Sequence, residues 1–161
     1  PFKKNNITKY YLDWLNNKKL MKFSNQRFYD HCHETSIKYL LSFKNSNNIF
    51  MTINKYNETK FIGTITAYIN KRHSTADIGV LIGNSSEKNR GHGLEAWTVL
   101  IDYLFVKHKI RKISAGTLSG NIPMIKIMQY SGMKLEGKRL KHEYADNKLQ
   151  DIHYYAKFNV K

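Results

Sequence analysis

Two glycines, Gly91 and Gly93, alternate at a point where one hydrophobic pattern gives way to another. The residues before this point, 76–82, are rich in β-forming side chains and predict a strand. The residues after it, 94–108, place their apolar side chains at helical spacing. A second β-rich run follows at residues 110–118. This succession predicts a β-α-β unit with a glycine loop between strand and helix, and hence a fold that contains parallel strands.

The residues before this unit predict two helices and a set of strands. Thr8 is a capping residue for a helix over residues 9–16, and an apolar stripe predicts a second helix over residues 35–43. Residues 21–33 have no clear period and predict a loop. Strands are predicted over residues 48–54, 61–69 and 76–82, with polar turns at 55–59 and 70–74. These strands predict an antiparallel meander.

A short helix and two strands complete the pattern. The helix is predicted over residues 123–130, with Gly132 as its C-cap. The strands are predicted over residues 135–144 and 152–158, on either side of a turn at 145–148. The order αα-βββ-α-β-α-ββ predicts an α+β fold with a mixed central sheet. No repeat, linker or change in composition divides the chain, so we expect one domain over residues 1–161.

The formal net charge of +15 indicates an anionic partner, such as a polyphosphate cofactor or a nucleic acid. Because the lysines are scattered, a solvated surface is the alternative explanation for most of them. The one cysteine, Cys32, excludes an internal disulfide, and its spacing with His31 and His33 does not suit a metal site. We expect no metal. No stretch predicts a membrane span or a signal peptide, so we expect a cytoplasmic protein without a membrane partner.

The glycine pair lies in a loop with the composition of a phosphate site, Lys88-Asn89-Arg90-Gly91-His92-Gly93. The glycines let the backbone approach a ligand closely, and the helix that follows presents the positive end of its dipole. The loop is not a dinucleotide fingerprint, because Ala96 replaces the third glycine and the later acidic residue is absent. It is not a Walker loop either. An ordinary turn is the alternative explanation of a bare Gly-x-Gly.

The segment IGNSSEKNRGHGLEAW resembles the acyl-CoA-binding motif of the GNAT superfamily of N-acetyltransferases, [Arg/Gln]-x-x-Gly-x-[Gly/Ala]. Lys88 stands at the first motif position. In detail the segment is similar to the subgroup of ribosomal-protein and sugar-nucleotide N-acetyltransferases. Asn121, the later segment MIKIMQYSGMKLEG, and Asp151 before the last aromatic strand match the same subgroup. The resemblance extends over residues 61–158.

The resemblance implies a GNAT-like sheet that splays into a V-shaped cofactor cleft between its two central strands, with acetyl-CoA as co-substrate. The end of the first of these strands would pair with the pantetheine arm, and the loop amides would hold the pyrophosphate. The implied cofactor-binding residues are Leu81, Ile82, Gly83, Lys88, Asn89, Arg90, Gly91, His92, Gly93, Leu94, Asn121 and Met124. For Asn121, capping of the next helix is an alternative role.

The implied reaction is direct attack of an amine on the thioester, in which positioning contributes up to ~7–11 kcal/mol. The predicted catalytic residues are Asp77, as the base that removes the amine's proton, and Asn121. A surface carboxylate is the alternative for Asp77, and Glu143 is a further acid near the predicted acceptor mouth. Many GNAT enzymes protonate the leaving thiolate with a tyrosine. That position here is Met128, which has no proton to donate, and Tyr130 would point about 200° away on the helix.

The acceptor is predicted to be a nucleotide-linked amino sugar or a protein N-terminus, because the high positive charge disfavours a polyamine. A homodimer and an association with the ribosome or with nucleic acid stay open. Two other functions also stay open. One is a non-catalytic basic module that binds nucleic acid with a steep salt dependence, and the other is a GNAT fold that binds acyl-CoA without activity.

Overall fold

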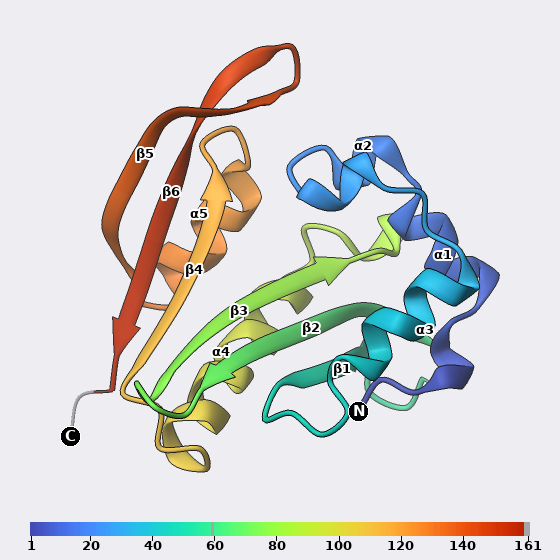
Figure 1. The fold of residues 1–161 in the computed structure, drawn as a ribbon, viewed down its shortest axis with the longest axis horizontal. Coiled ribbons are helices and arrows are strands. Elements are labelled where there is room, and N and C mark those ends of the chain that lie inside the picture. The colour runs from blue at the N-terminus through green and yellow to red at the C-terminus, as the bar shows by residue number, and fades with distance from the viewer. Residues whose placement is uncertain (59, 160–161) are drawn as a thin grey trace.

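The strands form one mixed sheet. The computed structural model describes residues 1–58 and 60–159, and these residues form a six-stranded sheet in the order β1-β2-β3-β4-β6-β5 (Figure 1). The strands are β1 (Ile49–Asn54), β2 (Phe61–Asn70), β3 (Thr75–Ile82), β4 (Lys112–Leu118), β5 (Lys134–Ala145) and β6 (Lys148–Phe158). Every predicted strand is present, which confirms the α+β fold class. Thr59, at the end of one predicted turn, lies outside the described residues.

The helices occupy the predicted positions, with additions near the N-terminus. They are α1 (Lys9–Leu15), α2 (Lys18–Met21), α3 (His33–Leu41), α4 (His92–Val106) and α5 (Ile122–Tyr130), with the 3-10 turns η1 (Lys4–Asn6), η2 (Asn25–Phe28) and η3 (Ser85–Glu87). Thr8 caps α1 as predicted, because its hydroxyl accepts a hydrogen bond from Tyr11 N at 3.3 Å. Gly132 follows α5 with φ +81°, as a C-cap requires.

The predicted loop over residues 21–33 is wrong in part, because η2 lies inside it and α2 ends at its first residue. Polar caps start both turns. Asn17 Oδ1 accepts from Leu20 N at 2.9 Å, and the Ser24 hydroxyl accepts from Gln26 N at 3.2 Å. Such short turns rest on local side-chain caps rather than on a hydrophobic period, so periodicity did not reveal them.

The two central strands separate after a short contact. β1, β2 and β3 form the predicted antiparallel meander. β3 and β4 are parallel but pair only from Thr75 with Lys112 to Asp77 with Ser114. Beyond these pairs β4 is held by β6 and β3 by β2, so the described part of the sheet opens into a V between β3 and β4. Figure 1 shows the two strands diverging toward their carboxyl ends.

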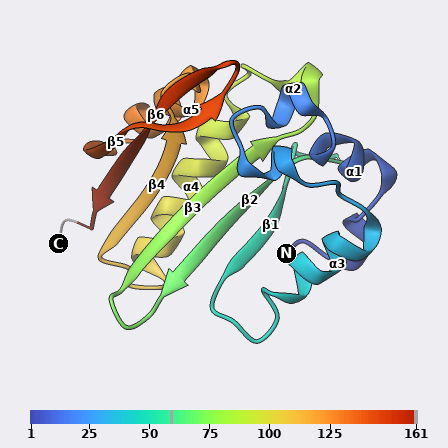
Figure 2. The same ribbon diagram turned by 45° about the horizontal axis from the view of Figure 1, so that its top comes forward.

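Two hydrophobic cores lie against the sheet. The larger joins the strands to α4 and α5, with Trp97, Ile101, Leu104 and Met128 fully buried. The smaller joins the N-terminal helices to β1 and β2 through an aromatic cluster that contains Phe2, Tyr11, Trp14, Phe50 and Phe61. Figure 2 shows α4 and the N-terminal helices on different sides of β1–β3. Among the described residues, no helix is long and apolar enough to cross a membrane.

Candidate functional site

The backbone of β3 has free hydrogen-bonding groups that point into the V. Gly83 N donates to Ile62 O at 3.0 Å, so Gly83 faces β2. In an antiparallel pair the hydrogen-bonded positions alternate, and the register with β2 therefore directs Leu81 to β2 and Val80 and Ile82 to the V. β3 and β4 do not pair at these positions. Val80 was not among the predicted site residues, although the alternation along β3 was a signal for it.

The start of α4 presents amide groups to a ligand. The helix begins at His92, two residues earlier than predicted, because Gly91 is its N-cap with φ +88°. Glu95 N donates to Gly91 O at 3.0 Å. The amides of the preceding residues, 92–94, belong to the first helical turn and have no partner within the helix. These amides and the helix dipole favour an anion, and they lie in the loop that was predicted to bind phosphate.

A cavity of about 550 Å³ joins this helix start to the V. It is lined by these residues of the predicted cofactor-binding set: Leu81, Ile82, Lys88, Asn89, Gly91, His92, Gly93, Leu94, Asn121 and Met124. Three more lysines line it, Lys19, Lys22 and Lys126, so that with Lys88 the cavity has four. We call it the phosphate cavity, after the loop that was predicted to bind phosphate. The cavity therefore collects part of the chain's positive charge around the amides. Lys19 and Lys22 come from the α2 region, and no motif marked them in the sequence.

Gly83 and Arg90, also predicted to bind the cofactor, do not line this cavity. A Cβ atom added at Gly83 would lie 1.9 Å from Trp14 Cδ2, so this glycine makes room for the Trp14 ring. Arg90 NH1 points toward Glu87, with Oε2 at 4.0 Å. Gly83 therefore packs against Trp14 and Arg90 lies near Glu87, a residue that lines the cavity.

Asn121 follows the carboxyl end of β4, at the open end of the V. It lines both the phosphate cavity and a second cavity of about 520 Å³ between the strands. Its side chain does not cap α5; its amide instead donates to Thr117 Oγ1 at 2.9 Å. Met128 is fully buried in the core, whereas Tyr130 lines the phosphate cavity. The helical rotation that separates the two residues therefore turns Tyr130, and not Met128, toward this cavity.

The two candidate bases lie in different places. Asp77 is at the closed end of the V, where its carboxylate accepts a hydrogen bond from Ser114 Oγ at 2.8 Å. It lines none of the cavities described here. Glu143, on β5, lines the cavity between the strands together with Asn121. Its Oε2 is 3.4 Å from Arg27 NH2.

Polar contacts connect the two sides of the V at its open end. Asn25 Nδ2 donates to Glu143 Oε1 at 3.2 Å, and Lys22 Nζ lies 3.4 Å from Asp146 Oδ2. The segment around η2 is thus connected to the β5–β6 hairpin, although more than 100 residues separate them along the chain. Figure 1 shows α2 and this hairpin on either side of the opening.

A third cavity, of about 560 Å³, lies under the N-terminal helices and reaches Val80 and Leu81. Tyrosines and hydroxyl groups dominate its lining. Asp30 is its one formally charged residue, and no lysine or arginine lines it. Ser36 is 5% exposed, and its hydroxyl has no hydrogen-bond partner among the described residues. The cavity therefore offers the carboxylate of Asp30 to a polar ligand, whereas the Ser36 hydroxyl oxygen is itself buried.

Two tyrosines of this cavity stay protonated near neutral pH. Burial raises the pKa of the Tyr11 hydroxyl well above its ordinary value. Burial, followed by the hydrogen bond with Tyr68, raises the pKa of Tyr39 in the same way. The Tyr39 and Tyr68 hydroxyl oxygens are 2.6 Å apart. These hydroxyls can donate a hydrogen bond to a ligand, but they do not act as bases.

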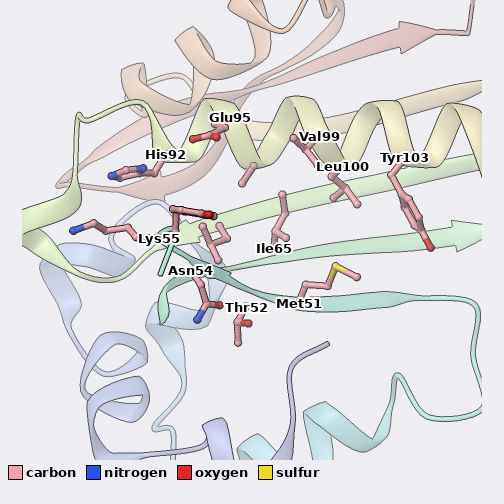
Figure 3. Close-up of a pocket in the computed structure, with 13 residues that line it drawn as sticks. Met51, Thr52, Asn54, Lys55, Ile65, His92, Glu95, Val99, Leu100 and Tyr103 are labelled. Atoms are coloured by element: carbon pink, nitrogen blue, oxygen red, sulfur yellow. The ribbon is translucent and has the colours of Figure 1, made fainter. Parts of the chain in front are cut away.

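The largest of the described cavities, about 760 Å³, is a groove between β1 and α4. Figure 3 shows its apolar wall, which contains Met51, Ile65, Val99, Leu100 and Tyr103, and its polar end at Lys55 and His92. It shares only His92 with the phosphate cavity. The predicted site residues therefore gather in the V and its extensions rather than in the largest hollow.

Comparisons with known proteins agree with this geometry. A family model for "Acetyltransferase (GNAT) domain" matches residues 1–134. An N-acetyltransferase of Bacillus subtilis (strain 168), YnaD, is 31% identical over 99 residues, which are 62% of this chain and 58% of that protein. The match thus covers less than two thirds of that relative's length.

Solved structures share the fold. A GNAT-family acetyltransferase from Bacillus anthracis has a TM-score of 0.80 at 21% identity, over 98% of this chain and 92% of that one. A ribosomal-protein-S5-alanine acetyltransferase from Vibrio fischeri has a TM-score of 0.78 at 21% identity, over 98% and 90%. A spermidine N-acetyltransferase from Vibrio cholerae, in complex with CoA and spermine, has a TM-score of 0.79 at 15% identity, over 94% and 89%.

Proposed function

The chain belongs to the acetyltransferase (GNAT) family, and on that premise we propose that it transfers the acetyl group of acetyl-CoA to a primary amine. The observation that carries the proposal is the V between β3 and β4, which continues into the amide-lined cavity at the start of α4. The free β3 backbone suits the amides of a pantetheine arm. The helix start and the four lysines suit the diphosphate to which that arm is attached. A simple anion site would explain the helix start and the lysines, but not the free backbone edge of β3.

The reaction needs the amine and the thioester side by side. In a ternary complex, the amine nitrogen attacks the carbonyl carbon, the C–S bond breaks, and coenzyme A leaves as a thiolate. An N–H of Val80 or Ile82, directed into the V, is placed to stabilise the carbonyl oxygen as it becomes negative. A thiol has an ordinary pKa of about 8.5. The thiolate therefore leaves without a dedicated acid, and Met128 is no obstacle.

For the base we favour Glu143 over Asp77. Glu143 lines the cavity that holds Asn121 and the free β3 edge, whereas Asp77 lies where β3 and β4 still pair. A carboxylate in the cavity can take the amine's proton directly or through one water. Asn121, with its amide held by Thr117, is placed to orient the thioester arm rather than to move a proton.

Replacing Glu143 with glutamine is expected to lower kcat by roughly 100-fold or more, because general bases contribute about 10²–10⁴. Glutamine keeps the side-chain length and an oxygen for Asn25 and Arg27, so KM for acetyl-CoA should change little. Steady-state kinetics at saturating acceptor would measure both values. Asp77→Asn is the matched control and should retain activity. The reverse pattern would return the role of base to Asp77.

For the acceptor we favour a protein N-terminus over a nucleotide-linked amino sugar. The cavity that reaches Val80 and Leu81 from under the N-terminal helices has no lysine or arginine to meet a nucleotide's phosphates. Its carboxylate, Asp30, suits a single ammonium group. A ribosomal-protein alanine acetyltransferase is among the structures with the same fold. One carboxylate is a poor match for a polyamine, which carries several charges.

Thiol release from acetyl-CoA would test the proposal on a panel of amines. We expect turnover with short peptides that carry a free N-terminus, and slower or no turnover with spermidine and with a nucleotide-linked amino sugar. Because Cys32 is exposed and free, its signal with a thiol reagent must be subtracted with an acetyl-CoA-free blank. Preference for the nucleotide-linked sugar would overturn the choice of acceptor. Absence of binding to acetyl-CoA and to CoA would overturn the proposed function and return nucleic acid as the ligand to test.

A further inference from the structure

A buried carboxylate stands inside the anion site, where its charge opposes that of the proposed ligand. Glu87, at the end of η3, lines the phosphate cavity and is 8% exposed. A phosphate group close to an ionised carboxylate is repelled by it. No motif in the sequence marks Glu87 as a functional residue, and the acetyl transfer described above does not use it.

The carboxylate of Glu87 contacts three basic side chains, two of them in or next to the loop and one in the β1–β2 hairpin. Oε1 accepts a hydrogen bond from Lys55 Nζ at 3.1 Å. Oε2 lies 3.1 Å from His92 Nε2 and 4.0 Å from Arg90 NH1. The hydrogen bond from Lys55 lowers the pKa of the carboxyl group below its ordinary value, so the group is ionised near neutral pH. Each oxygen thus holds a different part of the structure.

The two parts are the loop and the β1–β2 hairpin. His92 is the first residue of α4, and Arg90 comes just before its N-cap. Lys55 follows directly after β1 and also pairs with Glu58, at 2.7 Å. Figure 3 shows Lys55 and His92 at the same end of the groove between β1 and α4. Lys55 does not line the phosphate cavity, so it meets the loop through Glu87.

We infer that Glu87 is a positioning residue for the phosphate loop, which joins the start of α4 to the β1–β2 hairpin and so sets the direction of the loop amides toward the diphosphate. The inference rests on the proposed function, because it assigns the cavity to coenzyme A. Residues 88–91 of the loop are exposed, and Asn89 has a positive φ of 61°, so the hydrophobic core does not fix this part of the loop. The ion pairs through Glu87 supply the missing restraint, and their effect on loop geometry outweighs the repulsion of the ligand.

Glu87→Gln separates these two effects by the sign of its change in affinity. Glutamine removes the negative charge but keeps the shape of the side chain. If position dominates, Kd for CoA measured by titration calorimetry rises about tenfold, as expected for the loss of a charge-assisted hydrogen bond. If repulsion dominates, Kd falls. A Kd that is equal to or lower than that of the wild type overturns the inference.

Pantetheine, which lacks the phosphates, shows whether the effect is confined to the loop. The positioning role predicts that kcat/KM with S-acetylpantetheine is nearly unchanged in Glu87→Gln, while kcat/KM with acetyl-CoA falls. A general loss of structure would lower both values alike and would contradict the inference. Failure of the wild type to bind CoA at all would instead refute the proposed function, so the two failures are distinguishable.

Three further variants complete the test. Lys55→Met removes the connection to the hairpin without touching the cavity, and is expected to weaken CoA binding in the same direction. The double variant with Glu87→Gln should be no weaker than Glu87→Gln alone, because both changes break one network. Glu95→Gln is the charge-matched control: it lies in the first turn of α4 and lines the groove but not the phosphate cavity. Weaker CoA binding by this control, equal to that of Glu87→Gln, would overturn the inference.

Discussion

Replacing Gly83 with alanine is expected to destabilise the protein by about 3 kcal/mol or more, because overpacking of a core costs 1–3 kcal/mol and occasionally more. The new Cβ atom would lie 1.9 Å from Trp14 Cδ2 and 2.1 Å from Cε3. The ring has little room to move, since Trp14 is 5% exposed and packs against Phe61 with their ring centroids 5.3 Å apart. Thermal unfolding should show a fall in Tm on the order of 10 °C.

Gly137→Ala on β5 is the matched control, because a Cβ atom there meets nothing within 4 Å. Its Tm should stay close to that of the wild type. Gly83 was predicted from the sequence to bind the cofactor, and the structure instead places it against Trp14. A Gly83→Ala protein with unchanged Tm but weakened acetyl-CoA binding would contradict the packing role and favour the predicted one.

Replacing Gly93 with glutamate is expected to weaken acetyl-CoA binding by roughly 100-fold or more, since a like charge in a binding site costs several kcal/mol. Gly93 is buried in the first turn of α4 and lines the phosphate cavity. A Cβ atom there lies 3.2 Å from Ile127 Cδ1 and 3.6 Å from Ile82 Cγ1. Because these two residues also line the cavity, we expect a longer, charged side chain to occupy part of the space proposed for the diphosphate. Titration calorimetry with acetyl-CoA would measure the loss.

Gly93→Ala is the control for the backbone change alone. Its methyl group needs a shift of only a few tenths of an ångström at the flexible end of Ile127, so binding should fall far less than in Gly93→Glu. Circular dichroism of both variants would establish that α4 still forms. Equal and tight binding by both would mean that the diphosphate does not lie at the start of α4.

The sequence was sufficient to predict the helices and strands in which apolar side chains recur at regular spacing over several turns or strand pairs. The stripe of α4 that predicted a helix contains Trp97, Ile101 and Leu104, all fully buried. The glycine loop was found in its predicted place, because its conformation depends on the glycines themselves. Gly91 has the positive φ that glycine adopts without strain.

The parts that the sequence could not predict depend on contacts between distant segments. Glu143 reaches the mouth of the V through Arg27, 116 positions away along the chain. The place of Asp77 depended on where β3 and β4 stop pairing, which no local pattern records. The lining of the proposed acceptor cavity comes from four helical segments, three strands and the loop between η2 and α3 that contains Asp30. Its charge could therefore not be judged from the net charge of the chain, which is +15.

The short contact between β3 and β4 makes the sheet two halves that meet along a seam. One half contains β1, β2 and β3, and the other β4, β6 and β5. Among the described residues the strands of the two halves pair only from Thr75 to Asp77, next to one backbone hydrogen bond from Arg111 N to Ser74 O. Beyond Asp77, the backbone N–H and C=O groups of Val80 and Ile82 face the V and do not pair with β4. A pantetheine arm that occupies those groups would act as a missing strand. Coenzyme A would then add to the backbone pairing between the halves, and the folded protein would become more stable as the concentration of coenzyme A rises.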